Sequence, residues 1–229
     1  MKKGVNHLKT HKYNLRDIIL GGQDGLVNVL GIVLAVATAT NEIRIILISG
    51  LAATFAESLS MAAVAYTSTK ATRDYYFSLV EEEKKEIRKT PKKHEKQVKG
   101  IYYNKGFRGT LLNNIVSHII SDKKLWINTM VVEELNISPQ EYSSPLKSAL
   151  VVGFAAVIGS LIPLIPFIFL FPNKIMFALI LSILILFITG AIKAKLTIGS
   201  WIRSGLEMSI IGTLAAMVGY LIGLALGTI

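Results

Sequence analysis

The sequence predicts an all-α fold: a polytopic membrane protein with five transmembrane helices and a cytosolic helical insert between helices 2 and 3. Two observations predict it, namely long uncharged apolar stretches and one long basic, polar stretch that separates them. Hydrophobic residues make up 52% of the 229 positions, and the mean hydropathy is +0.50. A soluble domain of this length carries more charge and does not collect its apolar residues in such long runs.

The clearest span, residues 148–171, has 24 residues without a formal charge. A helix needs roughly 20 apolar residues to cross the hydrocarbon core. Pro163 and Pro166 lie inside this span and predict a kink. The other expected spans are about 25–40, about 45–69, 175–192 and 208–229. Short connections at 41–44 and 172–174 make helices 1 and 2, and helices 3 and 4, antiparallel neighbours.

Glycines recur every four residues in the last span, at Gly219, Gly223 and Gly227. This spacing lets helices approach closely, either within one chain or across a dimer.

The distribution of basic residues predicts the orientation of the spans. Of the 25 Lys and Arg residues, 23 fall in segments that would lie on one side of the membrane, and only Arg44 and Lys174 fall on the other. By the positive-inside rule, the N-terminus and the insert are cytosolic and the C-terminus lies on the opposite side. The net charge of +10 therefore reports topology and contact with membrane lipid, and we expect no nucleic-acid partner. No apolar core and cleavage site follow the basic start, so a cleaved signal peptide is not expected.

The polar stretch predicts a domain of its own. We place the boundaries at residues 1–69 (N-terminal segment and helices 1–2), 70–147 (the insert) and 148–229 (helices 3–5). Within the insert, helices are expected at 75–89, 92–105, 110–120 and 123–135, the first of them continuous with membrane helix 2. Trp126 is expected to dock an insert helix onto its neighbours.

Acidic residues in or beside the apolar spans carry the functional signal. Asp24, Glu57 and Glu207 lie there, and a carboxylate at membrane depth usually faces a protein interior or a wet pathway. Met61 is four residues after Glu57 and shares its helix face. A carboxylate with a thioether suits a borderline transition metal better than Mg²⁺ or Ca²⁺. The sequence has no cysteine, which excludes thiolate ligands and iron–sulfur clusters.

Each of these residues also has a structural interpretation. Asp24 would cap the start of the first helix, Met61 would fill space, and Glu207 would form an i,i+4 salt bridge with Arg203.

Several short motifs together resemble the vacuolar iron transporters. They are Asp24-Gly25-Leu26-Val27-Asn28, Ser60-Met61-Ala62, Ile101-Tyr102 before Lys105-Gly106, and Trp126 followed by Met130 and Glu134-Leu135. The resemblance covers essentially the whole chain, and we identify it as similar to a prokaryote-like member of that family. Val64-Ala65 departs from the glycine and glutamate that many relatives carry there.

The resemblance implies a homodimer with an ion path between the two first helices. It also implies export of Fe²⁺ from the cytosol by exchange with protons, with Mn²⁺, Co²⁺ and Zn²⁺ as further candidate ions. Asp24 and Met61 match path residues. The cytosolic ligand positions of the family fall on Glu83, Glu86, His94, Gln97, Met130, Val131 and Glu134. His94 remains a competent ligand, Gln97 is a weak oxygen donor, and Val131 cannot bind.

We therefore expect a secondary transporter, not an enzyme, with metal ligands Asp24, Glu57, Met61, Glu83, Glu86, His94, Met130 and Glu134, helped by Gln97 and Glu207. No resident cofactor is expected. The membrane would be the cell membrane in a prokaryote or a vacuole-like membrane in a eukaryote. Two other classes stay open: a membrane-bound carboxylate di-metal oxidase, which would want Glu-x-x-His pairs that the sequence lacks, and a structural membrane protein.

Overall fold

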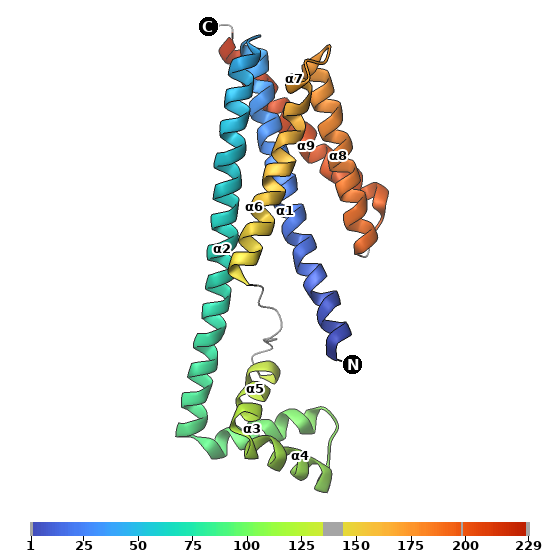
Figure 1. Cartoon of the computed structure of the whole chain (residues 1–229). Coiled ribbons are helices and arrows are strands. Elements are labelled where there is room, and N and C mark those ends of the chain that lie inside the picture. The colour runs from blue at the N-terminus through green and yellow to red at the C-terminus, as the bar shows by residue number, and fades with distance from the viewer. Residues whose placement is uncertain (1, 135–143, 198, 228–229) are drawn as a thin grey trace. The chain divides into compact units, whose positions relative to one another are not determined.

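The computed structural model describes residues 2–134, 144–197 and 199–227, and these residues contain helices but no strands (Figure 1). The elements are α1 (Lys2–Ala39), α2 (Ile43–Lys89), α3 (Pro91–Asn104), α4 (Gly109–Ser121), α5 (Lys123–Glu133), α6 (Pro145–Leu161), the 3-10 turn η2 (Ile162–Leu164), α7 (Ile165–Ile168), α8 (Lys174–Leu196) and α9 (Trp201–Gly227). The all-α expectation is confirmed.

The chain divides into two compact units. Unit 1 comprises Met1–Thr67 and Pro145–Ile229, and unit 2 comprises Ser68–Ser144. Within the described residues, five helical segments are long and apolar enough to cross a membrane: Leu15–Ala39, Ile43–Lys89, Pro145–Ile168, Lys174–Leu196 and Trp201–Gly227.

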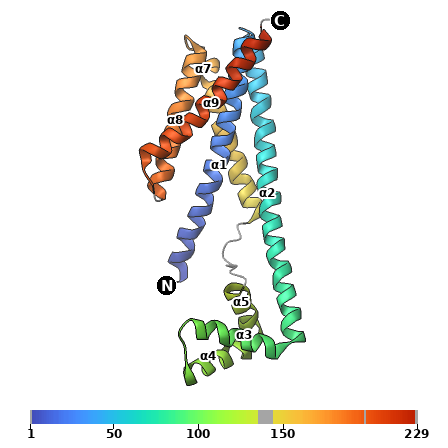
Figure 2. The same ribbon diagram turned by 180° about the vertical axis from the view of Figure 1, so that it is seen from behind.

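In unit 1, α1 packs against α6 and α9, and both run in the same direction as α1 (Figures 1 and 2). Glycines make the contact with α6 close. A Cβ at Gly25 would lie 2.4 Å from the carbonyl oxygen of Ala156, and one at Gly159 would lie 2.1 Å from that of Gly22. Small residues at such positions let two helix backbones approach each other.

The glycines of α9 serve the same purpose within the chain. A Cβ at Gly219 would lie 2.2 Å from the carbonyl oxygen of Gly31, and one at Gly223 would lie 2.3 Å from that of Ala35. The four-residue repeat of the sequence therefore packs α9 on α1.

The core of unit 1 lies where α1, η2, α7 and α8 meet. Val29, Val33, Leu164, Phe167 and Ala178 are buried there. This apolar cluster occupies the half of α1 that follows Asp24.

The predicted kink in the third span is confirmed. α6 ends at Leu161, the chain makes the 3-10 turn, and α7 continues to Ile168. Pro163 and Pro166 lack the backbone N–H that an α-helix needs, which explains the break.

Two expected boundaries were wrong. α1 begins at Lys2, well before residue 25, and α9 begins at Trp201, before residue 208. A helix does not have to end where its apolar part ends, and no proline interrupts either extension. Asp24 therefore lies inside α1, and its interpretation as a cap at the helix start was wrong.

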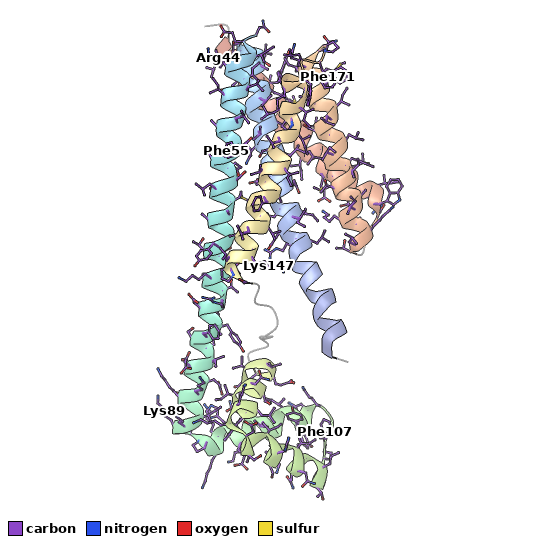
Figure 3. The ribbon with its side chains drawn as sticks, in the orientation of Figure 1. Arg44, Phe55, Lys89, Phe107, Lys147 and Phe171 are labelled. Carbon is purple, nitrogen blue, oxygen red and sulfur yellow. The ribbon has the colours of Figure 1, made fainter. Side chains whose placement is uncertain are left out.

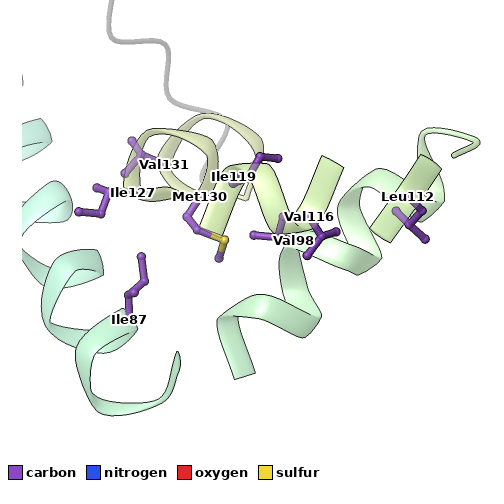
Figure 4. Close-up of a cluster of buried hydrophobic side chains, with 8 residues drawn as sticks. All are labelled: Ile87, Val98, Leu112, Val116, Ile119, Ile127, Met130 and Val131. Atoms are coloured by element: carbon purple, nitrogen blue, oxygen red, sulfur yellow. The ribbon is translucent and has the colours of Figure 1, made fainter. Parts of the chain in front are cut away.

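Unit 2 contains the C-terminal part of α2 with α3, α4 and α5 around one hydrophobic core. Figure 4 shows this core cluster, which is formed by Ile87, Val98, Leu112, Val116, Ile119, Ile127, Met130 and Val131. Trp126 is partly buried against it, as expected.

The helices expected in the polar stretch are present, and the continuity of α2 through residues 69–75 is confirmed. The last residue of the expected 123–135 helix lies outside the described residues. Local signals explain the boundaries. Pro91 begins α3, and the Asp122 side chain caps α5 by accepting from the N–H groups of Lys124 (2.8 Å) and Leu125 (3.2 Å). Gly106, between α3 and α4, and Gly109, the first residue of α4, adopt positive φ angles.

Candidate metal centres

The first candidate centre joins α1 and α2 inside unit 1. The side chains of Asp24 and Glu57 interact with each other, and the amide of Asn28, one turn after Asp24, also interacts with Glu57. Two neighbouring carboxylates repel each other unless a proton or a cation lies with them. The pair is therefore suited to hold a positive charge at membrane depth.

Met61 lies one turn beyond Glu57 on α2 and is partly buried. The nearby hydroxyls are occupied: Thr54 Oγ1 donates to the carbonyl of Gly50 at 2.8 Å, and Ser58 Oγ donates to that of Thr54 at 2.6 Å. The donor atoms that this stretch of α2 offers toward a metal are thus the carboxylate of Glu57 and the thioether of Met61, with the hydroxyl of Ser60 beside them.

Glu207 does not join this pair. It is exposed on α9, and within the described part of the chain no interaction links it to Asp24 or Glu57. No ion pair joins it to Arg203 in the described residues either, so the expected i,i+4 bridge is not formed.

Sequence reasoning missed Asp17. Its carboxylate accepts a hydrogen bond of 2.6 Å from Ser148 Oγ, which ties α1 to α6. The expected first span began at about residue 25, so Asp17 was not weighed as a site residue. Its seven-residue distance from Asp24, two helical turns, is the signal that places both on one face of α1.

The second candidate centre lies in unit 2, between α2 and α3. His94 Nε2 is 3.6 Å from Glu83 Oε1, and the two side chains are 5% and 13% exposed. His94 Nδ1 lies 2.9 Å from the carbonyl oxygen of Thr90, to which only a protonated Nδ1 can donate. With a proton on Nδ1, the charged ring pairs with Glu83 through Nε2, and loss of the Nε2 proton would free a lone pair for a metal ion on the same side, the orientation that metal-binding histidines use.

α3 and α5 extend the same centre. Gln97 Nε2 donates to Glu134 Oε1 at 2.8 Å. Gln97 Oε1 and Glu83 Oε1 are both buried and accept no hydrogen bond in the described structure. Each such acceptor costs about 1–3 kcal/mol. A cation is the kind of group that would pair with such an acceptor.

The electrostatics of Glu83 agree with this arrangement. Burial raises the pKa of its carboxyl group, His94 opposes the rise, and the carboxylates of Glu134 and Glu86 add to it. Negative charge on Glu86 of α2 and on Glu134, which directly follows α5, thus acts on Glu83. Glu86 itself is half-exposed and pairs with Lys89 at 3.3 Å.

Met130 and Val131 lie in the hydrophobic core and are fully buried (Figure 4). Met130 packs with Ile87 and Val98, which follow Glu83 and His94 by one turn on α2 and α3. Among the described residues, no three His, Asp or Glu side chains are grouped closely enough to hold an ion by themselves. A site here needs the amide of Gln97 or the thioether of Met130.

Comparison with known proteins decides the family. A family model described as the VIT family matches residues 15–224. The chain belongs to the VIT family. The resemblance expected from the sequence is confirmed.

Individual VIT relatives are similar over most of their length. Vacuolar iron transporter 1 of Tulipa gesneriana is 28% identical over 208 residues, which cover 90% of this chain and 84% of the relative. The protein of the same name from Arabidopsis thaliana is 27% identical over 209 residues, covering 90% and 83%. The vacuolar iron transporter of Plasmodium falciparum is 28% identical over 236 residues, covering 98% and 86%.

These names are those of transporters, in agreement with the expectation that this VIT protein is not an enzyme. Together with the five apolar helices, they make the chain a multi-pass membrane protein.

Proposed function

We propose that this protein is a secondary transporter that exports Fe²⁺ from the cytosol in exchange for protons. The observation that carries the proposal is the interaction of two carboxylates, Asp24 of α1 and Glu57 of α2, within apolar helices. The names of the VIT relatives support iron as the ion.

The exchange follows from the chemistry of the pair. In the metal-free state, a proton on one carboxyl group relieves the repulsion between Asp24 and Glu57. When Fe²⁺ arrives, the ion replaces the proton and takes the thioether of Met61 as a further ligand. When Fe²⁺ leaves on the opposite side, protons return to the carboxylates. Mn²⁺, Co²⁺ and Zn²⁺ accept the same donors, and Mn²⁺ is the nearest alternative cargo.

The unit 2 centre collects metal on the cytosolic side. We assign Glu83, His94, Gln97 and Glu134 to it, with Met130 beneath them and Glu86 at its edge. Its donors suit Fe²⁺, which accepts oxygen and imidazole nitrogen together. The site has fewer carboxylates than the full set of glutamates that the resemblance implies.

The proposed topology puts the N-terminus and residues 70–147 in the cytosol and the C-terminus on the opposite side. The basic residues support it, because 23 of 25 then face the cytosol. The working unit is a homodimer with the path between the first helices. Membrane lipid surrounds the spans. The host membrane is the cell membrane or a vacuole-like membrane.

Proteoliposomes that contain an iron-sensitive dye test the proposal. Wild-type protein should carry Fe²⁺ into them, and a pH dye should report protons moving the other way. Asp24→Ala and Met61→Ala should abolish uptake while the protein stays folded. Glu42→Ala, which removes an exposed acid at a helix end, is the matched control and should transport normally. Wild-type flux in both path variants would refute the proposal.

A further inference from the structure

An apolar pocket of about 810 Å³ lies in unit 1, at the end of the bundle that carries the α1–α2 and α7–α8 connections. Binding pockets for small organic ligands measure about 300–1,000 Å³. The pocket is open to the surroundings, and α1, α2, α7, α8 and α9 all contribute to its wall. Asp24, Glu57 and Met61 do not line it, so it is separate from the metal path.

The floor and the rim of the pocket differ. Leu34, Ile46 and Phe167 form a buried apolar floor. Met217 and Tyr220 of α9 line the rim and are 58% and 43% exposed. Because α9 is one of the helices apolar enough to cross a membrane, such exposed apolar side chains suit contact with hydrocarbon, and a lipid tail could reach the rim of the pocket.

One end of the pocket is polar. Asn41, Asn173 and Lys174 line it there. Lys174 is half-buried and forms no ion pair among the described residues. It begins α8, whose first turn receives no side-chain cap from Asn173. The pocket thus combines an unpaired ammonium group with uncapped backbone N–H groups, and both favour an anion.

The charge pattern makes Lys174 unusual. It and Arg44 are the two basic residues expected on this side of the membrane, where lysine and arginine are rare. Arg44 is exposed and does not line the pocket; Figure 3 labels it at the same end of unit 1 as Phe171. Glu42 is exposed there too and also lies outside the pocket wall. No carboxylate lines the pocket, which opposes a cation as its ligand.

We propose that this pocket binds an anionic phospholipid, with an acyl chain against the apolar floor and the phosphate at Lys174. The ligand needs both an acyl chain and an anionic headgroup, because the wall of the pocket is apolar along most of its length and positively charged at one end. Tyr220 lines the pocket with an aromatic ring that also carries a hydroxyl, the kind of side chain that contacts headgroups at membrane interfaces. The lipid would bridge α1, α8 and α9 on the side opposite the basic segments.

Native mass spectrometry of the full-length protein tests the headgroup. The protein is titrated in detergent with phosphatidylglycerol or with phosphatidylcholine that has identical acyl chains. Both lipids carry the phosphate, but the quaternary ammonium of phosphatidylcholine offsets its charge. We therefore expect the wild type to retain phosphatidylglycerol about tenfold more strongly, because only its headgroup brings a net negative charge to Lys174. Lys174→Gln should remove this preference, whereas Arg44→Gln, the same change outside the pocket, should keep it.

A second pair of variants tests the acyl-chain contact. Met217→Trp narrows the pocket and should weaken retention of both lipids, whereas Leu221→Trp, at an exposed position of α9 outside the pocket, should not. Equal retention of the two lipids by the wild type, or an unchanged preference in Lys174→Gln, would overturn the proposal. So would displacement of the lipid by inorganic phosphate alone, or a dimer that dissociates in Met217→Trp without any change in bound lipid. The last result would assign the surface to a second copy of the chain.

Discussion

At the residue scale, Glu83 is a buried carboxylate whose charge is only partly compensated in the metal-free centre of unit 2. Its carboxylate is buried beside His94 but accepts no hydrogen bond through Oε1 within the described structure. When it is ionised, such a carboxylate destabilises the metal-free protein. A bound cation removes this destabilisation. Glu83 is therefore the residue at which pH and metal compete most directly.

The pH dependence of stability should expose this competition. Because the pKa of Glu83 in the folded chain lies above its ordinary value of 4.5, the folded state holds the proton more firmly than the unfolded chain does. Metal-free wild-type protein should therefore lose stability as the pH rises from the pKa of Glu83 in the unfolded chain through its higher pKa in the folded chain.

Glu83→Gln should lack this loss, melting above the wild type at neutral pH and equally in acid. Melting followed by the fluorescence of Trp126, in a Trp201→Phe background and with a chelator present, measures it. Parallel curves for the two proteins at every pH would contradict the assignment.

Met130 raises a different question, because its side chain packs in the core and is also a proposed ligand. Met130→Leu keeps the volume and should change stability by less than about 1.5 kcal/mol. It removes the sulfur, so Fe²⁺ binding measured by anaerobic calorimetry should weaken. Met130→Ala, the packing control, should cost about 2–5 kcal/mol. Unchanged Fe²⁺ affinity in Met130→Leu would reduce Met130 to a packing residue.

At the scale of elements, the contacts of α1 depend on small residues. Its faces toward α6 and α9 are lined by glycine and alanine, and carbonyl oxygens of one helix lie where side chains of the other would begin. An added methyl group at these positions would clash with a backbone carbonyl. The close contacts also set the rotation of α1 about its own axis, and therefore the direction in which Asp24 points within unit 1.

The contact between α9 and α1 gives a matched pair of variants. Gly219→Ala would put a Cβ 2.2 Å from the carbonyl oxygen of Gly31, and the resulting overpacking should cost about 1–3 kcal/mol. Gly31→Ala, across the same contact, would meet the carbonyl oxygen of Ala215 at an ordinary 3.6 Å and should be tolerated. Thermal melting in detergent compares them. A lower melting temperature for Gly31→Ala than for Gly219→Ala would show that the helices pack differently.

At the scale of the whole molecule, the chain has no native cysteine, which makes its topology easy to test. Lys99→Cys in α3 and Glu42→Cys before α2 are both exposed positions. In intact cells, a membrane-impermeant maleimide should label Glu42→Cys, and Lys99→Cys should react only after permeabilisation. The opposite pattern would invert the proposed orientation.

Much of the helical architecture follows from the sequence, because apolar run length and 3.6-residue periodicity are local properties. The helices of the polar stretch, the break at Pro163 and the continuity of α2 were predicted on that basis. The true start of α1 was not predicted, because no helix-breaking residue in the sequence marks a boundary between the membrane helix and its polar extension.

The candidate centres were predictable only in part. Residue type and spacing identified Asp24, Glu57, Glu83 and His94. The contact between Asp24 and Glu57 depends on which faces of α1 and α2 meet, and tertiary packing decides that. Asp17 escaped notice for the same reason, because its partner Ser148 is distant in the sequence.

The most direct measurement is Fe²⁺ flux through the isosteric variants Asp24→Asn and Glu57→Gln in proteoliposomes. Each substitution removes one charge of the pair and keeps its shape. We predict that each single variant loses Fe²⁺ uptake together with the opposing proton movement, and that the double variant is no worse than either, because the two carboxylates act as one unit. A double variant that carries Fe²⁺ at the wild-type rate would contradict the account.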